Sequence, residues 1–222
     1  MRAFFLTAVS LLFLLNSGCF LGTFQTAQTV PPGEVNYGFY ADMPVYFNKS
    51  DKDASKDKGL GAFVTPNVGG YLIYGASPGL NFGLRGSLGE GIGPFAKFRF
   101  LDESVMPLSG AATFTIGYHP VAQGISLRSD LIFSRMLSSY SSIYFGWTFL
   151  RSPDYRKLAN KDIKIEDVQE FKYFHSLFVG VDLKRRPDEN DELGWVPFGL
   201  TIELAVPLVK YPALFFGFQL KR

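Results

Sequence analysis

The 222-residue chain has one cysteine, two histidines and a formal net charge of only +2. The lone thiol, Cys19, excludes an internal disulfide and any zinc site that needs two cysteines. The near balance of charge gives no broad attraction to nucleic acid or to acidic substrates. We therefore expect no bound metal, no cofactor and no nucleic-acid partner.

Long hydrophobic runs are also missing, except at the N-terminus. There the run Ala3–Leu15 follows Met1-Arg2 and precedes the small residues Ser17 and Gly18, which is the pattern of a secretory signal. The run is shorter than the roughly 20 residues that a membrane-spanning helix needs. We expect residues 1–18 to be a cleaved signal peptide and leave them out of the fold.

Aromatic residues and glycine, by contrast, are abundant. The chain contains 23 Phe, 11 Tyr and 23 Gly, and aromatics make up 16% of it. This composition is heavy for a soluble globular protein and is typical of a sheet that presents rings to lipid.

Apolar residues alternate with small or polar ones in segments of about ten residues, the length of a strand that crosses a membrane at a tilt. In one of them, Phe82 and Leu84 face one side while Gly83 and Arg85 face the other. The pattern predicts strands at 34–47, 66–75, 80–88, 94–101, 111–119, 125–135, 142–151, 171–184, 195–206 and 212–221.

Tight turn signals separate several of these segments, for example at Ala76–Gly79 and Gly89–Gly93. Consecutive strands therefore pair as antiparallel hairpins. The predicted fold is all-β, an antiparallel up-and-down transmembrane barrel of about ten strands. Eight strands are an alternative, because the stretch 61–74 contains Pro66 and a Gly-Gly pair.

The barrel is expected to occupy residues 34–222, after an N-terminal periplasmic segment at 19–33. About ten strands and their loops use up the mature chain, so its length leaves no room for a plug domain. With a periplasmic N-terminus the charged connections 48–60 and 152–170 become outer loops. We expect a monomer. A soluble barrel of lipocalin type is an alternative that would place the rows of Phe inside.

Three stretches resemble features of bacterial envelope proteins. Residues 22–33 and the alternating stretch after them resemble the start of small outer-membrane β-barrel proteins of uncharacterised function. The stretch Leu15–Cys19 resembles a lipoprotein signal, although Asn16 stands where that family favours Leu. The last strand resembles the assembly signal of bacterial barrels but ends Lys221-Arg222. The resemblance implies an outer-membrane location, acylation of Cys19, and lipid and the barrel-assembly machinery as partners.

Seven charged residues fall on the inward face of the predicted strands. Because an isolated buried charge costs several kcal/mol, they must pair with each other or meet interior water. A packed, salt-bridged lumen and a narrow pore whose positive excess favours anions are both open. The seven are Arg85, Lys97, Arg99, Arg128, Asp130, Asp182 and Glu203.

The two histidines do not indicate a catalytic site. His175 falls on the outward face, and His119 lies inward near the rim with Ser126 and Asp130 on the next strand. This grouping only loosely resembles the outer-membrane barrels that deacylate or transfer acyl chains, and it matches no motif of those families. We expect no catalytic residues and no enzyme. The leading hypothesis is a structural or interaction role in the cell envelope, with a narrow solute pore and a lipid-modifying enzyme at the outer rim as alternatives.

Overall fold

The computed structural model of the protein describes residues 23–46, 67–120, 122–153, 171–184, 199–208 and 213–221. The predicted signal peptide, Cys19 and most of the two predicted outer loops lie outside these ranges. Their predictions therefore remain predictions.

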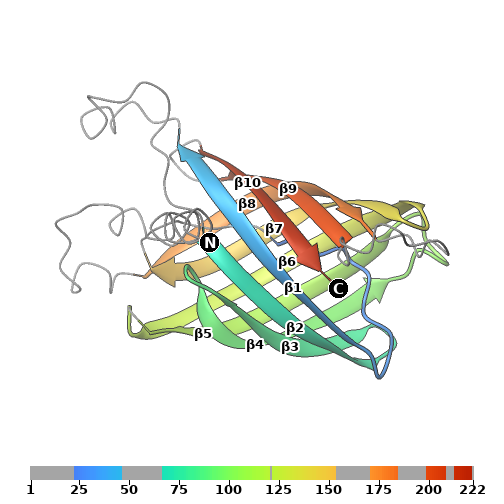
Figure 1. Cartoon of the computed structure of the whole chain (residues 1–222), viewed down its shortest axis with the longest axis horizontal. Helices are drawn as coiled ribbons and strands as arrows, with labels where there is room; N and C mark the ends of the chain where they lie inside the picture. The colour runs from blue at the N-terminus through green and yellow to red at the C-terminus, as the bar shows by residue number, and fades with distance from the viewer. Residues whose placement is uncertain are drawn as a thin grey trace, which may run out of the picture.

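Ten antiparallel strands close into a barrel in the order β1-β10-β9-β8-β7-β6-β5-β4-β3-β2. Each strand pairs with its neighbours in the chain, and β1 closes the ring against β10 (Figure 1). This confirms the predicted fold class with ten strands and not eight. The strands are β1 Val35–Tyr46, β2 Asn67–Ser77, β3 Leu80–Ser87, β4 Gly91–Leu101, β5 Ser109–His119, β6 Gly124–Ser138, β7 Ser141–Pro153, β8 Phe171–Leu183, β9 Gly199–Pro207 and β10 Ala213–Lys221.

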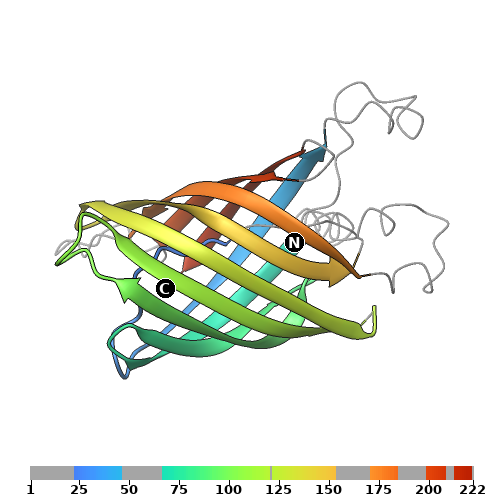
Figure 2. The ribbon, with the colours of Figure 1, turned by 180° about the vertical axis from the view of Figure 1, so that it is seen from behind.

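The two ends of the barrel differ, and we name them by their connections. At the turn end the odd-numbered strands begin, and residues 78–79, 102–108 and 139–140 connect the strands there. At the loop end the odd-numbered strands finish, so that both predicted outer loops start from this end. Figures 1 and 2 show the tilted strands from opposite sides.

The side chains follow the two-residue period of a pleated strand. On β3, Phe82 and Leu84 are 48% and 51% exposed, whereas Asn81 before them and Arg85 after them are buried. The same pattern on the other strands covers the outside with apolar residues and lines the inside with polar ones. The rows of Phe thus point outward, which contradicts the lipocalin alternative.

No helix in the ranges given above is long and apolar enough to cross a membrane.

The N-terminal part of the described chain lies in the lumen. The backbone reverses at Pro31–Glu34, where Gly33 N–H donates to Gly75 O (2.8 Å) at the turn end. The residues before this reversal (Figure 1, dark blue) lead up to the start of β1. Of these residues, Thr23–Ala27 are buried. We call Thr23–Val30 the lumen segment.

This placement differs from the periplasmic segment expected at 19–33. A short extended segment is enough to occupy a narrow barrel. Such a segment also carries backbone N–H and C=O groups that can satisfy buried charges. Alternation identifies the wall of a barrel, and it carries no information on what fills the barrel.

Candidate functional site

The buried charged residues gather in the lumen. Six of the seven predicted lumen charges are almost fully buried: Arg85, Lys97, Arg128, Asp130, Asp182 and Glu203. The seventh, Arg99, lies near the turn end, where the β4–β5 register shifts between Arg99 and Leu101. Its Nη2 is 2.8 Å from Asp102 Oδ2, and its side chain is 24% exposed. Arg99 therefore belongs to the rim.

Asp102, in the turn after β4, accepts a hydrogen bond from Ser104 N–H at 3.0 Å. This bond, then the Ser104 hydroxyl and the Arg99 charge, lowers the pKa of the Asp102 carboxyl. The Arg99–Asp102 pair thus stays ionised at neutral pH, although its exposure to solvent makes it a weak contribution to stability.

An arginine–carboxylate cluster lies in the loop-end half of the lumen. Arg128 Nε lies 2.9 Å from Asp130 Oδ1 and 3.0 Å from Oδ2, because the two residues are two positions apart on the same face of β6. Arg128 also forms an ion pair with Glu90, whose other oxygen lies 3.3 Å from Arg85 Nε. Two arginines and two carboxylates therefore compensate each other's charge out of bulk water.

Glu90 was missed by the sequence reasoning, which treated it as part of a tight turn. It belongs to the short connection between β3 and β4, and it is only 5% exposed. The connection can fold inward because Gly117 has no side chain: a Cβ there would lie 2.6 Å from Ser126 Oγ and 3.1 Å from Glu90 O. Ser126 Oγ donates to Glu90 O and holds the connection in place. An acidic turn residue beside inward-facing glycines was the available signal.

Asp130 is the most heavily bonded of these carboxylates. Besides Arg128, it accepts hydrogen bonds from Thr113 Oγ1 and Thr148 Oγ1, both at 2.6 Å, on the strands that flank β6. Thr23 Oγ1 of the lumen segment adds a fourth partner at 3.2 Å. The cluster therefore ties three wall strands to the segment.

The side chain of Glu203 on β9 binds backbone N–H groups at the start of the lumen segment. Its two carboxylate oxygens accept from Thr23 N–H (2.6 Å) and Phe24 N–H (2.7 Å), residues about 180 positions away in the chain. Tyr144 Oη donates to Glu203 at 2.8 Å and orients it. Glu203 thus joins the lumen segment to β9 and, through Tyr144, to β7.

Basic side chains bind the carbonyls of the same segment. Lys97 Nζ donates to Thr26 O and Gln28 O, both at 2.6 Å. Arg85 Nη1 donates to Thr23 O at 3.2 Å. On β6, Ser134 Oγ accepts from Ala27 N–H at 3.0 Å. The barrel thus holds the segment mainly by its main chain.

The aromatic side chain of Phe24 packs the lumen segment against the wall, at a position where the wall has no side chain. The Phe24 ring packs beside Tyr40 with the centroids 5.4 Å apart. It also lies over Gly217, where an added Cβ would come within 2.2 Å of Phe24 Cζ. Gly217 therefore provides the space that Phe24 fills.

A cavity of about 300 Å³ runs beside the segment toward the turn end. The segment lines one side of it, and Asn81, Lys97 and Asp182 lie on the barrel side. The lumen is thus filled near Thr23 and partly open nearer the turn end.

The predicted rim grouping of His119, Ser126 and Asp130 does not form a catalytic arrangement. His119 Nδ1 accepts from Ala122 N–H at 3.0 Å, so the other ring nitrogen, Nε2, carries the proton that it shares with Leu88 O at 3.0 Å. Both nitrogens therefore hold backbone at the loop end, while Ser126 and Asp130 bond the partners described above. In the part of the chain that the structure describes, no group of three His, Cys, Asp or Glu side chains could hold a metal ion.

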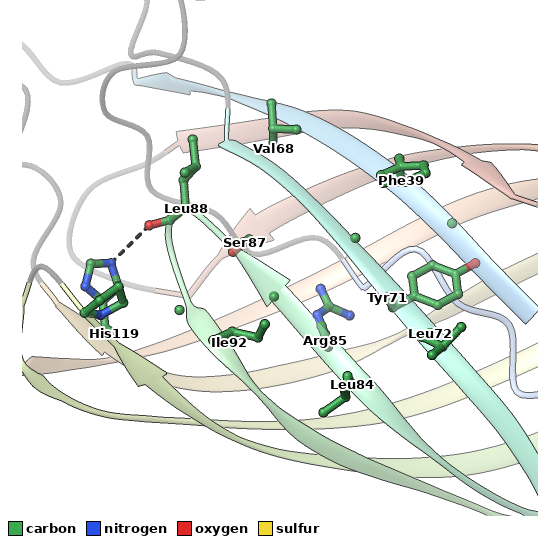
Figure 3. A pocket seen from close by; sticks show the side chains of 15 residues that line it. Phe39, Val68, Tyr71, Leu72, Leu84, Arg85, Ser87, Leu88, Ile92 and His119 are labelled. Atoms are coloured by element: carbon green, nitrogen blue, oxygen red, sulfur yellow. Dashed lines mark hydrogen bonds between the residues drawn. The ribbon is translucent and has the colours of Figure 1, made fainter.

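An apolar groove of about 540 Å³ lies on the barrel wall across β1–β4 (Figure 3). Gly70 and Gly86, opposite each other on β2 and β3, form its floor. Exposed apolar side chains surround them: Phe39, Leu72, Leu84, Leu88 and Ile92. The groove is thus a shallow part of the apolar outer surface.

The sequence matches no protein-family model and no curated protein. Its fold is similar to solved bacterial outer-membrane barrels. The COG4313 outer membrane channel from Pseudomonas putida F1 aligns over 92% of this chain and 99% of that one, with 10% identity and a TM-score of 0.41. Ail, the attachment invasion locus protein of Yersinia pestis, aligns over 86% and 99%, with 11% identity and a TM-score of 0.32.

The N-terminal β-barrel domain of Pseudomonas aeruginosa OprF aligns over 84% of this chain and 97% of that domain, with 11% identity and a TM-score of 0.31. With identities and TM-scores this low, conclusions about function rest on this chain's own side chains.

Proposed function

We propose that the protein is an integral outer-membrane β-barrel of a diderm bacterium with a structural or interaction role in the cell envelope. The observation that carries the proposal is a closed barrel with an apolar outside and a polar, charged inside. Only a closed barrel satisfies every strand's backbone hydrogen bonds within lipid. The outward rows of Phe, Leu, Ile and Val supply the lipid-facing band of such a barrel.

The filled lumen supports a structural or interaction role over an open pore. Thr23–Ala27 and the arginine–carboxylate cluster are buried together across the inside of the barrel. A partner would then meet the protein at its ends and not through its centre. Acylation of Cys19, delivery by the barrel-assembly machinery and a monomeric state belong to this proposal as predictions.

The test is fractionation of cells that express the full chain, followed by gels of boiled and unboiled outer membranes. We expect the protein in the outer-membrane fraction, with a mobility that changes on boiling because a folded barrel resists detergent. Recovery in the soluble periplasm would contradict the proposal. The same experiment with Cys19→Ala is expected to leave the barrel in the membrane, since the strands themselves span it.

Introducing a charge on the outer surface of the barrel tests quantitatively whether that surface faces lipid. Phe114 lies mid-strand on β5 and is 49% exposed, so Phe114→Arg should lower the free energy of unfolding in lipid vesicles by about 2–4 kcal/mol. Val105, 83% exposed in the turn after β4, is the control, and Val105→Arg should have almost no effect. Equal effects of the two substitutions would mean that Phe114 does not face lipid.

A further inference from the structure

Thr23 is the residue of the lumen segment that bonds to several strands of the wall. Its N–H bonds Glu203 on β9, its carbonyl accepts from Arg85 on β3, and its hydroxyl reaches β6 and β7. On β6 the hydroxyl accepts from Arg128 Nη2 at 3.0 Å. Hydrogen bonds through one residue therefore bridge walls on different sides of the barrel.

None of the contacts described for the lumen segment is covalent, and most involve its main chain. Most of the wall side chains that bind it are acidic or basic residues, and the others are hydroxyls, all of which interior water can satisfy when the segment leaves. The cavity beside the segment reaches toward the turn end. Release of the segment would join this cavity to the space around Glu203 and Asp130.

We propose that the barrel is a conduit for small cations that its own N-terminal segment, Thr23–Val30, holds shut. Conduction is a function beyond the structural role proposed above. The segment is the gate, and the carboxylates that it uncovers form the path.

Charge decides the class of solute. The buried cations of the lumen are Arg85, Lys97 and Arg128, and the buried acids are Asp42, Glu90, Asp130, Asp182 and Glu203. In the part of the chain that the structure describes, the buried acidic residues thus outnumber the buried basic ones, five to three. This count reverses the positive excess counted from sequence, because Asp42 and Glu90 also lie inside and Arg99 lies at the rim. Acidic rings select cations in narrow pores.

The experiment measures currents of the folded full chain in planar lipid bilayers under a KCl gradient. Gly217→Ala removes the space that Phe24 occupies, and Lys97→Met removes the cation bound to Thr26 O and Gln28 O. We expect wild type to be almost silent and each variant to raise the open probability at least about tenfold. The reversal potential should show selectivity for K⁺ over Cl⁻.

The matched control is Gly70→Ala on the outer wall, where a Cβ would meet Gly38 O at 3.2 Å and no lumen residue. It should stay as silent as wild type. Variants that fold, as judged by mobility on unboiled gels, but conduct no more than wild type would overturn the proposal. Anion-selective openings, or a wild type that conducts as much as the variants, would overturn it too.

A measurement on the unperturbed gate covers the case in which neither variant folds. Thr26 is buried in the closed lumen, so Thr26→Cys in a Cys19→Ser chain should react with a charged thiol reagent only when the segment is released. Slow labelling in intact vesicles is expected. A thiol that stays unlabelled in the folded barrel after hours, although it reacts fully once the barrel is unfolded, would show that the segment never leaves and would overturn the proposal.

Discussion

Replacing Arg128 by methionine should lower the free energy of unfolding by about 3–5 kcal/mol, because the substitution leaves two buried carboxylates without their main cation. Arg128 is 2% exposed and binds both Glu90 and Asp130. With Arg85 alone left to compensate them, the two acids repel each other inside the lumen. The measurement is urea unfolding of the folded barrel in lipid vesicles.

The control for this prediction lies on the same strand. Arg135 is exposed, so Arg135→Met should change the free energy of unfolding by less than about 0.5 kcal/mol. A second comparison isolates the pairing: adding Glu90→Gln to Arg128→Met should recover part of the loss, since one uncompensated charge disappears. Equal losses for Arg128→Met and Arg135→Met would show that the cluster contributes nothing.

Gly93→Ala is expected to prevent the barrel from closing between β4 and β5. An added Cβ at Gly93 would lie 1.8 Å from Ile116 O and 2.6 Å from Gly117 Cα, which are backbone atoms that cannot rotate away. Relief therefore requires a shift of the whole strand pair and should cost more than about 4 kcal/mol, a loss that is exceptional for one methyl group. We expect the heat-modifiable band to be lost.

Gly86→Ala is the matched control, because Gly86 lies on the neighbouring strand and its nearest contact is the Ile92 side chain at 3.1 Å. A side chain can adjust by a few tenths of an ångström, so the folded band should persist. Loss of the band in both variants would point to a general intolerance of the sheet to side chains at glycine positions. Its persistence in both would contradict the proposed clash at Gly93.

The faces of the strands, and their number to within the alternatives of ten and eight, were predictable from sequence, and the reason is local. A strand in lipid must alternate, because successive side chains point to opposite faces of one thin wall. Phe82 and Leu84 against Asn81 and Arg85 show this period, and the structure places them outside and inside as expected. Short turns such as Ser77–Leu80 required consecutive strands to pair.

The contents of the lumen could not be predicted in the same way. Alternation assigns a residue to a face but not to a height along the barrel axis, so it could not show that Arg85, Arg128 and Glu203 meet around Thr23. Glu90 has no strand period because it lies in a turn, and the inward fold of that turn depends on Gly117, which lies on another strand.

The sequence by itself thus determined an up-and-down wall of about ten strands, with eight as the alternative, since the pattern of each strand depends only on the two environments that its faces meet. Only the tertiary structure decided that the wall encloses its own N-terminal segment, with more acidic than basic residues buried around it in the described part of the chain. The physical reason is closure. Joining β1 to β10 brings residues about 180 positions apart within hydrogen-bond distance, and there the backbone of residues 23–28, which lies outside the strands, becomes the partner for buried charged side chains.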